Sequence, residues 1–83
     1  MSIETEMRQR LIAAFAPERL EITNESHRHA GHSGDDGSGE SHFAVVIRAA
    51  ALASMGRVAR HRAVHQALGD LVVRIHALGI DAA

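Results

Sequence analysis

Histidine is the residue type whose number and placement point to chemistry in this sequence. Seven of the 83 residues are His, whereas Cys, Trp and Tyr are absent and Phe occurs only twice. Imidazole titrates near neutral pH and ligates metals as its neutral ring, so we look for function around the histidines. Because the chain has no thiolate of its own, a site for a metal that prefers sulfur must take that sulfur from another molecule.

Three of the histidines lie in a segment whose composition predicts a long loop. His27, His29 and His32 fall within residues 27–41, which also contain four of the seven Gly. This composition supports no packed element, and long loops in small domains are usually either functional or simply disordered. Two interpretations therefore stay open: a loop that supplies metal ligands, and a solvated insertion.

A second group of histidines lies at helical spacing. His61 and His65 form an H-x-x-x-H pattern, which can place two zinc ligands on one helix face, but the residues between them lack the Glu of a metalloprotease. Both fall on the apolar side of the helix predicted there, so we expect semi-buried packing groups rather than zinc ligands.

Apolar periodicity predicts the elements that must position these side chains. A stripe that includes Ile3, Met7 and Leu11 predicts a helix over residues 2–16, with Ile12 beside it, ended by Pro17. Period-two alternation then predicts strands over residues 20–24 and 43–48, the second of them inside the sheet.

The second half of the chain predicts one more helix and one more strand. The helix, residues 57–71, has an apolar arc, and the strand covers residues 73–80, with Ile75 and Ala77 pointing inward and His76 on the other face or at the rim. The arc consists of Val58, Val64, Leu68, Leu71 and Val72, and Val73 shares the inward side of the strand. A right-handed crossover makes the last two strands parallel and the first two antiparallel. The predicted fold is an α+β sandwich in helix-strand-strand-helix-strand order, with both helices on one face of a three-stranded mixed sheet.

Length and charge narrow the class of protein. The chain is expected to form one domain over residues 1–83, monomeric when isolated. Its net charge of −1 combines nine Arg, no Lys and ten acidic residues, so net charge argues neither for nor against an acidic partner. The acidic start is unlike a secretion signal and no stretch has membrane-spanning length, so a cytoplasmic location without membrane contact is expected.

Four short motifs in a fixed order carry a resemblance to a known family. They are N-E-S-H-R-H at 24–29, S-H-F at 41–43, R-H-R-A-V-H at 60–65 and I-H-A-L at 75–78. In order and spacing they resemble the signatures of the BolA family, over nearly the whole chain. The resemblance implies a class II KH-like α+β sandwich, in agreement with the order of elements predicted from periodicity.

The family resemblance also implies a function. It implies a heterodimer with a monothiol glutaredoxin and a [2Fe-2S] cluster bridged between the two proteins, with no cluster in the isolated chain. The glutaredoxin supplies a cysteine and its bound glutathione a second sulfur, while a BolA-like protein offers a histidine from its last strand and often a Cys or His from the long loop. These ligands map onto His76 and His29, with His27 and His32 as competing loop ligands. Since imidazole is a weaker donor to iron than thiolate, such a site suits transfer of the cluster more than storage.

The partner surface is expected around the second helix and the last strand, where arginines can form a basic patch. The expected contact residues are Arg60, His61, Arg62, Arg74, Ala77 and Leu78. The patch suits either the acidic surface of a glutaredoxin or a phosphate backbone.

Three other functions compete with this interpretation. A DNA-binding transcriptional regulator is suggested by the KH-like fold, but the G-x-x-G spacing at 31–34 lies between strands rather than between helices, and Phe15 and Phe43 belong to core patterns. An enzyme is not expected, because a Gly-rich loop lacks the rigid orientation that catalysis needs. A free-standing zinc chelator built from the loop histidines is the third alternative.

Overall fold

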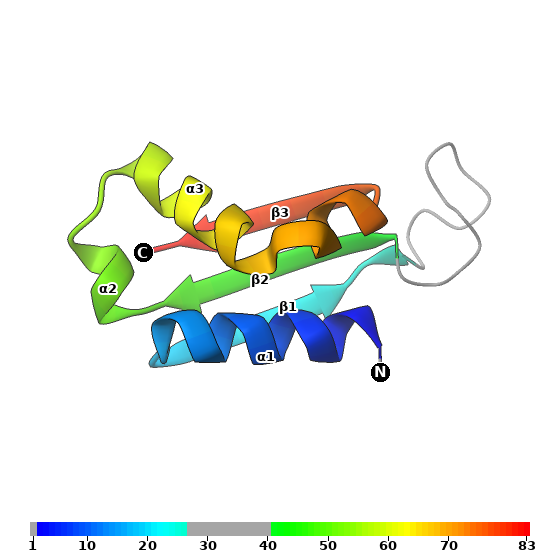
Figure 1. The fold of residues 1–83 in the computed structure, drawn as a ribbon, viewed down its shortest axis with the longest axis horizontal. Helices are drawn as coiled ribbons and strands as arrows, with labels where there is room; N and C mark the ends of the chain where they lie inside the picture. Colours follow the sequence, from blue (N-terminus) through cyan, green and yellow to red (C-terminus); the bar gives the residue numbers. More distant parts are fainter. Residues whose placement is uncertain (1, 27–40) are drawn as a thin grey trace.

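The computed structural model describes residues 2–26 and 41–83 (Figure 1). Its elements are α1 (Ile3–Phe15), β1 (Arg19–Asn24), β2 (His42–Arg48), α2 (Ala50–Ala53), α3 (Arg57–Leu68), the 3-10 helix η2 (Gly69–Arg74) and β3 (Ala77–Ala82). Within these two ranges, no helix has the length and apolar character needed to cross a membrane. Apart from the short α2 and η2, the chain has the predicted helix-strand-strand-helix-strand order.

The sheet has three strands in the order β1-β2-β3, with β2 in the centre. β1 and β2 are antiparallel, with Ile22 opposite Val45, and β2 and β3 are parallel, with Val45 beside Ile80. A parallel pair needs a crossover connection, and α3 provides it. The mixed sheet and its central second strand confirm the predicted topology.

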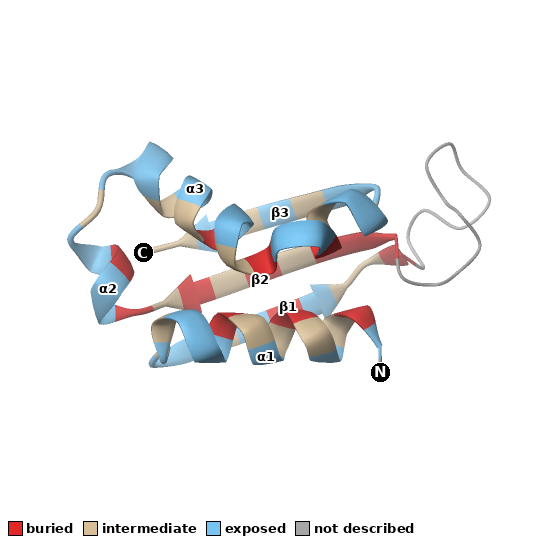
Figure 2. Ribbon diagram, viewed as in Figure 1, coloured by how far each residue is buried: buried red, intermediate tan, exposed pale blue. Residues whose placement is uncertain are grey.

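Both long helices cover the same face of the sheet, and the core lies between them and β2 (Figures 1 and 2). On β2, Phe43, Val45 and Ile47 are buried while Ala44 and Val46 between them are half-buried. The helical segments add Ile3, Met7, Leu11, Leu52, Val64, Leu68 and Leu71 to the core. Burial of one apolar stripe from each helix against one face of the sheet is what stabilises a two-layer domain of this size.

The first helix, Ile3–Phe15, agrees with the predicted residues 2–16 to within one residue at each end. The Oγ of Ser2 accepts a hydrogen bond from the backbone N–H of Thr5, which caps the start of α1. At the other end Ala16 has φ 45° and donates its N–H to the carbonyl of Ile12, and Pro17 follows. Ile12 itself is 50% exposed, so it lies outside the buried stripe.

The last strand begins later than predicted. The sequence predicted a strand over residues 73–80, whereas β3 begins at Ala77. Gly69 has φ 57°, which ends α3, and the chain continues in the tighter turns of η2. Val73 is therefore 84% exposed, and Ile80 rather than Ala77 packs against the core. The inward side predicted for this strand was wrong at Val73 and Ala77, whereas Ile75 packs against the core as predicted.

The exposed face of α3 also differs from the prediction. Val58 is 62% exposed, and His61 and His65 are exposed as well. Val64 and Leu68 are buried as expected. The expectation that the two histidines are semi-buried packing groups was wrong.

Small residues explain the difference. Ala63 and Ala67 pack against the core cluster next to Val64 and Leu68, so the buried stripe runs along the alanine side of α3. Alanine is only weakly hydrophobic, so the sequence pattern does not mark its side of the helix as buried. Valine is strongly hydrophobic, so Val58 was assigned to the buried side. The helix also ends three residues earlier than predicted, at Leu68 rather than at position 71.

Candidate functional site

His76 lies immediately before β3, at the end of the sheet where β2 begins (Figure 1). Its side chain is exposed. Its backbone is fixed, because the N–H of His76 and the N–H of Ala77 both donate to the carbonyl oxygen of Ser41, at 2.8 and 3.1 Å. The imidazole therefore projects into solvent at the rim of the sheet from a backbone that is hydrogen-bonded to the neighbouring strand.

A second histidine lies against His76. The ring of His42, the first residue of β2, has its centroid 5.2 Å from that of His76, with the two planes tilted by 48°. His42 is only 5% exposed, and its Nδ1 is hydrogen-bonded to the Oγ of Ser41 at 2.7 Å. The exposed ring of His76 thus packs against a buried ring whose Nδ1 is hydrogen-bonded.

Ser26 connects the two described parts of the chain, 2–26 and 41–83, by hydrogen bonds next to this histidine pair. Its Oγ accepts hydrogen bonds from the backbone N–H groups of Ser41, at 2.8 Å, and His42, at 3.0 Å. Its own N–H donates to the Oδ1 of Asn24 at 2.9 Å. Ser26 and Ser41 are both buried, so the ends of the predicted loop are fixed next to His76.

This serine and histidine network was not predicted. Ser26, Ser41 and His42 all belong to the N-E-S and S-H-F motifs, but no role was predicted for them, and Ser41 was expected in the loop. The motifs themselves were the available signal, because short polar residues between a strand and a glycine-rich segment often bond to nearby backbone groups. The predicted loop ligands His27, His29 and His32 lie outside the described residues.

The expected partner-contact residues fall at two separate places. Arg74, Ala77 and Leu78 lie near His76, with Arg74 exposed and paired with Glu6 at 3.5 Å. The remaining three, Arg60, His61 and Arg62, belong to the first half of α3, which lies at the other end of β3 (Figure 1). The structure therefore does not bring the six residues together on one small surface.

One ionisable group close to this region has a shifted pKa. The side-chain hydrogen bond from Arg10, reinforced by the charge of that guanidinium, lowers the pKa of Asp70 below its usual value of 3.8. The Nη1 atom of Arg10 also donates to the carbonyl oxygen of Leu68 at 2.7 Å. Arg10 thus joins α1 to the point where α3 passes into η2.

The arrangement of metal-ligating side chains limits which metal sites the described residues can form. Among them, no three or more His, Cys, Asp or Glu side chains are grouped so that they could bind a metal ion. A single exposed imidazole on a fixed backbone fits a different role, that of one ligand in a site completed by another molecule.

Comparison with known proteins identifies the relatives of this fold. The family model described as BolA-like protein matches residues 11–83. The chain belongs to the BolA-like family. The motifs quoted from the sequence and the order of the elements agree with this membership.

Curated relatives cover most of the BolA-like chain. An uncharacterized protein in the cobS 5' region of Sinorhizobium sp is 51% identical over the whole chain, which spans 91% of that protein. BolA-like protein 1 of Mus musculus is 40% identical over 96% of the chain, but the chain spans only 56% of its length. The Haemophilus influenzae relative, 38% identical over 96% of the chain and 75% of its own length, is named DNA-binding transcriptional regulator BolA.

Solved structures of the family superpose on the chain. BolA1 from Arabidopsis thaliana matches with a TM-score of 0.82 at 36% identity, over 94% of this chain and 86% of that one. The BolA domain of SufE1 from Arabidopsis thaliana matches with a TM-score of 0.79 at 34% identity, over the same shares. The second match shows that a BolA domain also occurs as part of a larger protein.

Proposed function

We propose that this BolA-like chain is a carrier that docks with a monothiol glutaredoxin and shares a [2Fe-2S] cluster with it through His76. The observation that supports the proposal best is the combination of exposure and fixation at His76. Its ring is open to a partner, while its backbone is hydrogen-bonded to Ser41 and its ring lies against that of buried His42. A ligand held in this way loses little conformational freedom when iron binds.

The absence of cysteine supports a cluster site shared with another protein rather than one formed by this chain alone. The chain contains no cysteine, so thiolate ligands for the cluster must come from the glutaredoxin and its glutathione. The cluster is the cargo of the pair, and imidazole is the weaker of the two kinds of ligand. We therefore expect the BolA-like side of the bridge to open first when an acceptor takes the cluster.

The second ligand from this chain is proposed to come from the loop. Ser26 is hydrogen-bonded to Ser41 and His42, which lie beside His76. His29 follows Ser26 by three positions, and three residues span at most about 11 Å when extended. Chain length therefore allows His29 to reach the neighbourhood of His76, and His27 and His32 remain its competitors.

In this proposal each group of the chain has a limited task. His76 presents a neutral ring nitrogen to iron, His42 limits the orientations of that ring, and Ser41 fixes the backbone from which it projects. Arg74, Ala77 and Leu78 lie next to His76 and are proposed to contact the glutaredoxin. No group of the chain is asked to make or break a covalent bond in a substrate, so the chain acts as a carrier and not as an enzyme.

Reconstitution tests the proposal. The chain is mixed with a monothiol glutaredoxin and glutathione, iron and sulfide are supplied, and visible circular dichroism and native mass are recorded. We expect a one-to-one complex that contains the cluster, and a strongly changed spectrum with His76→Ala. His65→Ala is the matched control, because it removes an exposed histidine from α3 and should leave the spectrum unchanged. A His76→Ala complex with the wild-type spectrum would remove His76 from the ligand set.

DNA binding is the second candidate function. The name of the Haemophilus influenzae relative supports it, as do the arginines of α3. The structure gives it less support at the level of bases, because Phe43 is buried and Phe15 packs against the core, and the sequence has no Trp or Tyr for stacking. Titration of a labelled DNA duplex at physiological salt tests this candidate, and tight binding there would favour it.

A further inference from the structure

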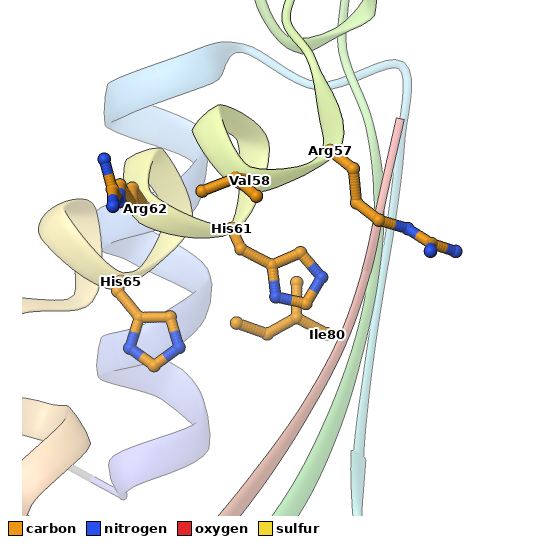
Figure 3. A pocket seen from close by; sticks show the side chains of 6 residues that line it. All are labelled: Arg57, Val58, His61, Arg62, His65 and Ile80. Carbon is orange, nitrogen blue, oxygen red and sulfur yellow. The ribbon is translucent and has the colours of Figure 1, made fainter.

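A basic groove lies between α3 and the second half of β3, away from His76. Its larger hollow, of about 620 Å³, is lined by Arg57, Val58, His61, Arg62, His65 and Ile80. A smaller hollow of about 310 Å³ continues it along β3 and shares Arg57, His61 and Ile80 with the first. In Figure 3 the rings of His61 and His65 project from one side of α3, and Ile80 of β3 lines the same hollow. We call this surface the α3–β3 groove.

The groove gathers arginines that have no acidic partner among the described residues. Elsewhere in the described ranges Arg10, Arg19, Arg48 and Arg74 each pair with a carboxylate. By contrast, Arg57, Arg60 and Arg62 make no ion pair within the part of the chain that the structure describes, and α3 itself contains no acidic residue. The one carboxylate on the groove's lining, that of Asp81, is 3.1 Å from Arg48. Of the four arginines without an ion pair in residues 2–26 and 41–83, three therefore lie on α3, and the fourth is Arg8 of α1.

Arg60 has a buried hydrogen-bond donor for which the described residues provide no acceptor. Its Nε is buried and has no hydrogen-bond partner among the described residues. It lies one helical turn before buried Val64, so the stem of the side chain is held against the core side of α3. A buried donor without an acceptor is unfavourable, and a carboxylate that approaches along the groove supplies the acceptor.

The residues that line the groove also indicate which kind of ligand it can bind. A divalent cation is opposed by Arg57 and Arg62, so the two histidines of the groove are better suited to anion contacts than to a metal. Val58 is 62% exposed, and together with Ile80 it gives the hollow an apolar side. Guanidinium groups beside exposed aliphatic side chains suit a ligand that combines carboxylates with apolar groups.

We infer that the α3–β3 groove binds an acidic segment of a partner protein, in which Asp or Glu side chains contact Arg57, Arg60 and Arg62 and an apolar side chain rests on Val58 and Ile80. Positive charge without acidic partners and an apolar side, present together, favour such a polypeptide over a phosphate backbone. A nucleic acid would match the charge but would leave Val58 and Ile80 without an apolar partner.

The groove is a separate site from the one proposed at His76. His76 and Ile80 are four positions apart, which corresponds to about 13 Å along an extended chain. α3 runs alongside β3 in the opposite direction, so the start of α3 lies near the end of β3 (Figure 1). The lining of the groove therefore includes neither His76 nor the residues proposed to contact the glutaredoxin beside it.

Selection from a random peptide library tests the inference without a known partner. Phage-displayed peptides are selected on the wild-type chain, and recovered peptides are labelled and titrated by fluorescence anisotropy. We expect recovered sequences to be rich in Asp and Glu next to apolar residues, and their affinity to fall by about tenfold or more in an Arg57→Gln, Arg60→Gln, Arg62→Gln variant. Val58→Ser should weaken binding by a smaller factor.

Matched controls show whether binding belongs to the α3–β3 groove or to another part of the surface. Arg8→Gln removes an arginine of α1 with no ion pair in the described structure, and His76→Ala removes the proposed iron ligand; both should bind the recovered peptides as the wild type does. Far-ultraviolet circular dichroism must show that the triple variant is folded. The inference is overturned if selection recovers no binders or binders without an acidic excess, or if the triple variant binds equally well. It is also overturned if a labelled DNA duplex competes for the same arginines with higher affinity than every recovered peptide.

Discussion

The ring of exposed His76 rests against the ring of buried His42, with 5.2 Å between their centroids. Ser41 connects the two residues a second time, because its Oγ bonds to the Nδ1 of His42 and its carbonyl accepts from the N–H of His76. The ring of His42, on β2, therefore limits the orientations open to the ring of the proposed ligand. Variants of His42 should change the cluster site without touching the partner surface.

Replacement of His42 by Ala is expected to leave glutaredoxin binding nearly unchanged while it alters the visible circular dichroism of the shared cluster and speeds cluster loss. The reason is that His76 gains rotational freedom when the ring beside it is removed. His42→Phe restores a ring without its nitrogens and should recover part of the wild-type spectrum. If cluster lifetime and spectrum in His42→Ala equal those of the wild type, ring contact has no part in positioning His76.

Ser26→Ala should destabilise the fold by about 1–3 kcal/mol, because it leaves two backbone N–H groups without their acceptor next to a buried side chain. Those donors belong to Ser41 and His42. Urea unfolding followed by circular dichroism measures the change. Ser54→Ala is the matched control: Ser54 is exposed, and its replacement should have almost no effect.

Gly69→Ala is expected to cost about 1–3 kcal/mol of stability, since a residue with a Cβ is strained at this backbone conformation. Gly69 has φ 57°, and an added Cβ would lie 3.3 Å from the Nη1 of Arg10. Thermal unfolding gives the comparison. Gly79→Ala, where an added Cβ meets nothing within 4 Å, should be neutral or slightly stabilising. Equal losses in the two variants would contradict a role for the φ of Gly69 at the junction between α3 and η2.

The ion pair between Arg10 and Asp70 should contribute to stability in a pH-dependent way. Because Arg10 lowers the pKa of Asp70 in the folded chain, the contribution is present above the unfolded value near 3.8 and is lost as pH falls through the lower folded value. The effect is small, since the side chain of Asp70 is 65% exposed. Asp70→Asn should lower the Tm by at most a few degrees at neutral pH, with the difference from wild type vanishing in strong acid.

A double-mutant cycle with Arg10→Gln shows whether this pH dependence belongs to the pair. In the Arg10→Gln background, Asp70→Asn should produce no further pH-dependent change in Tm. A difference that persists unchanged into strong acid would mean that the substitution acts through something other than the charge of Asp70.

Much of the fold could be predicted because most segments have one dominant pattern. Ile3, Met7 and Leu11 repeat at helical spacing, and Phe43, Val45 and Ile47 alternate, and each set is buried on the face that the pattern indicates. The start of the last strand was predicted wrongly because Gly69 changes the direction of the backbone just before the apolar residues 71–73. Val73 and its neighbours look like a strand by composition, but they form η2.

The candidate site was predicted less completely than the fold. Family motifs indicated His76, yet the contact with His42 joins residues 34 positions apart in sequence and depends on the parallel register of β2 and β3, in which His42 is beside Ala77. The α3–β3 groove was missed for a similar reason. His61 and His65 were assigned to the core side of α3, whereas the packing of Ala63 and Ala67 turns both histidines outward.

The central claim is that this chain donates an imidazole nitrogen to iron in a cluster held jointly with a glutaredoxin. Pulsed electron paramagnetic resonance of the reduced complex, made with isotopically labelled histidine in this chain only, measures that bond directly. We predict a hyperfine coupling from the labelled nitrogens that is unchanged between the wild type and His65→Ala and is diminished in His76→Ala, in which only the proposed loop ligand remains. A cluster-containing complex that shows no coupling to any histidine of this chain would contradict the claim.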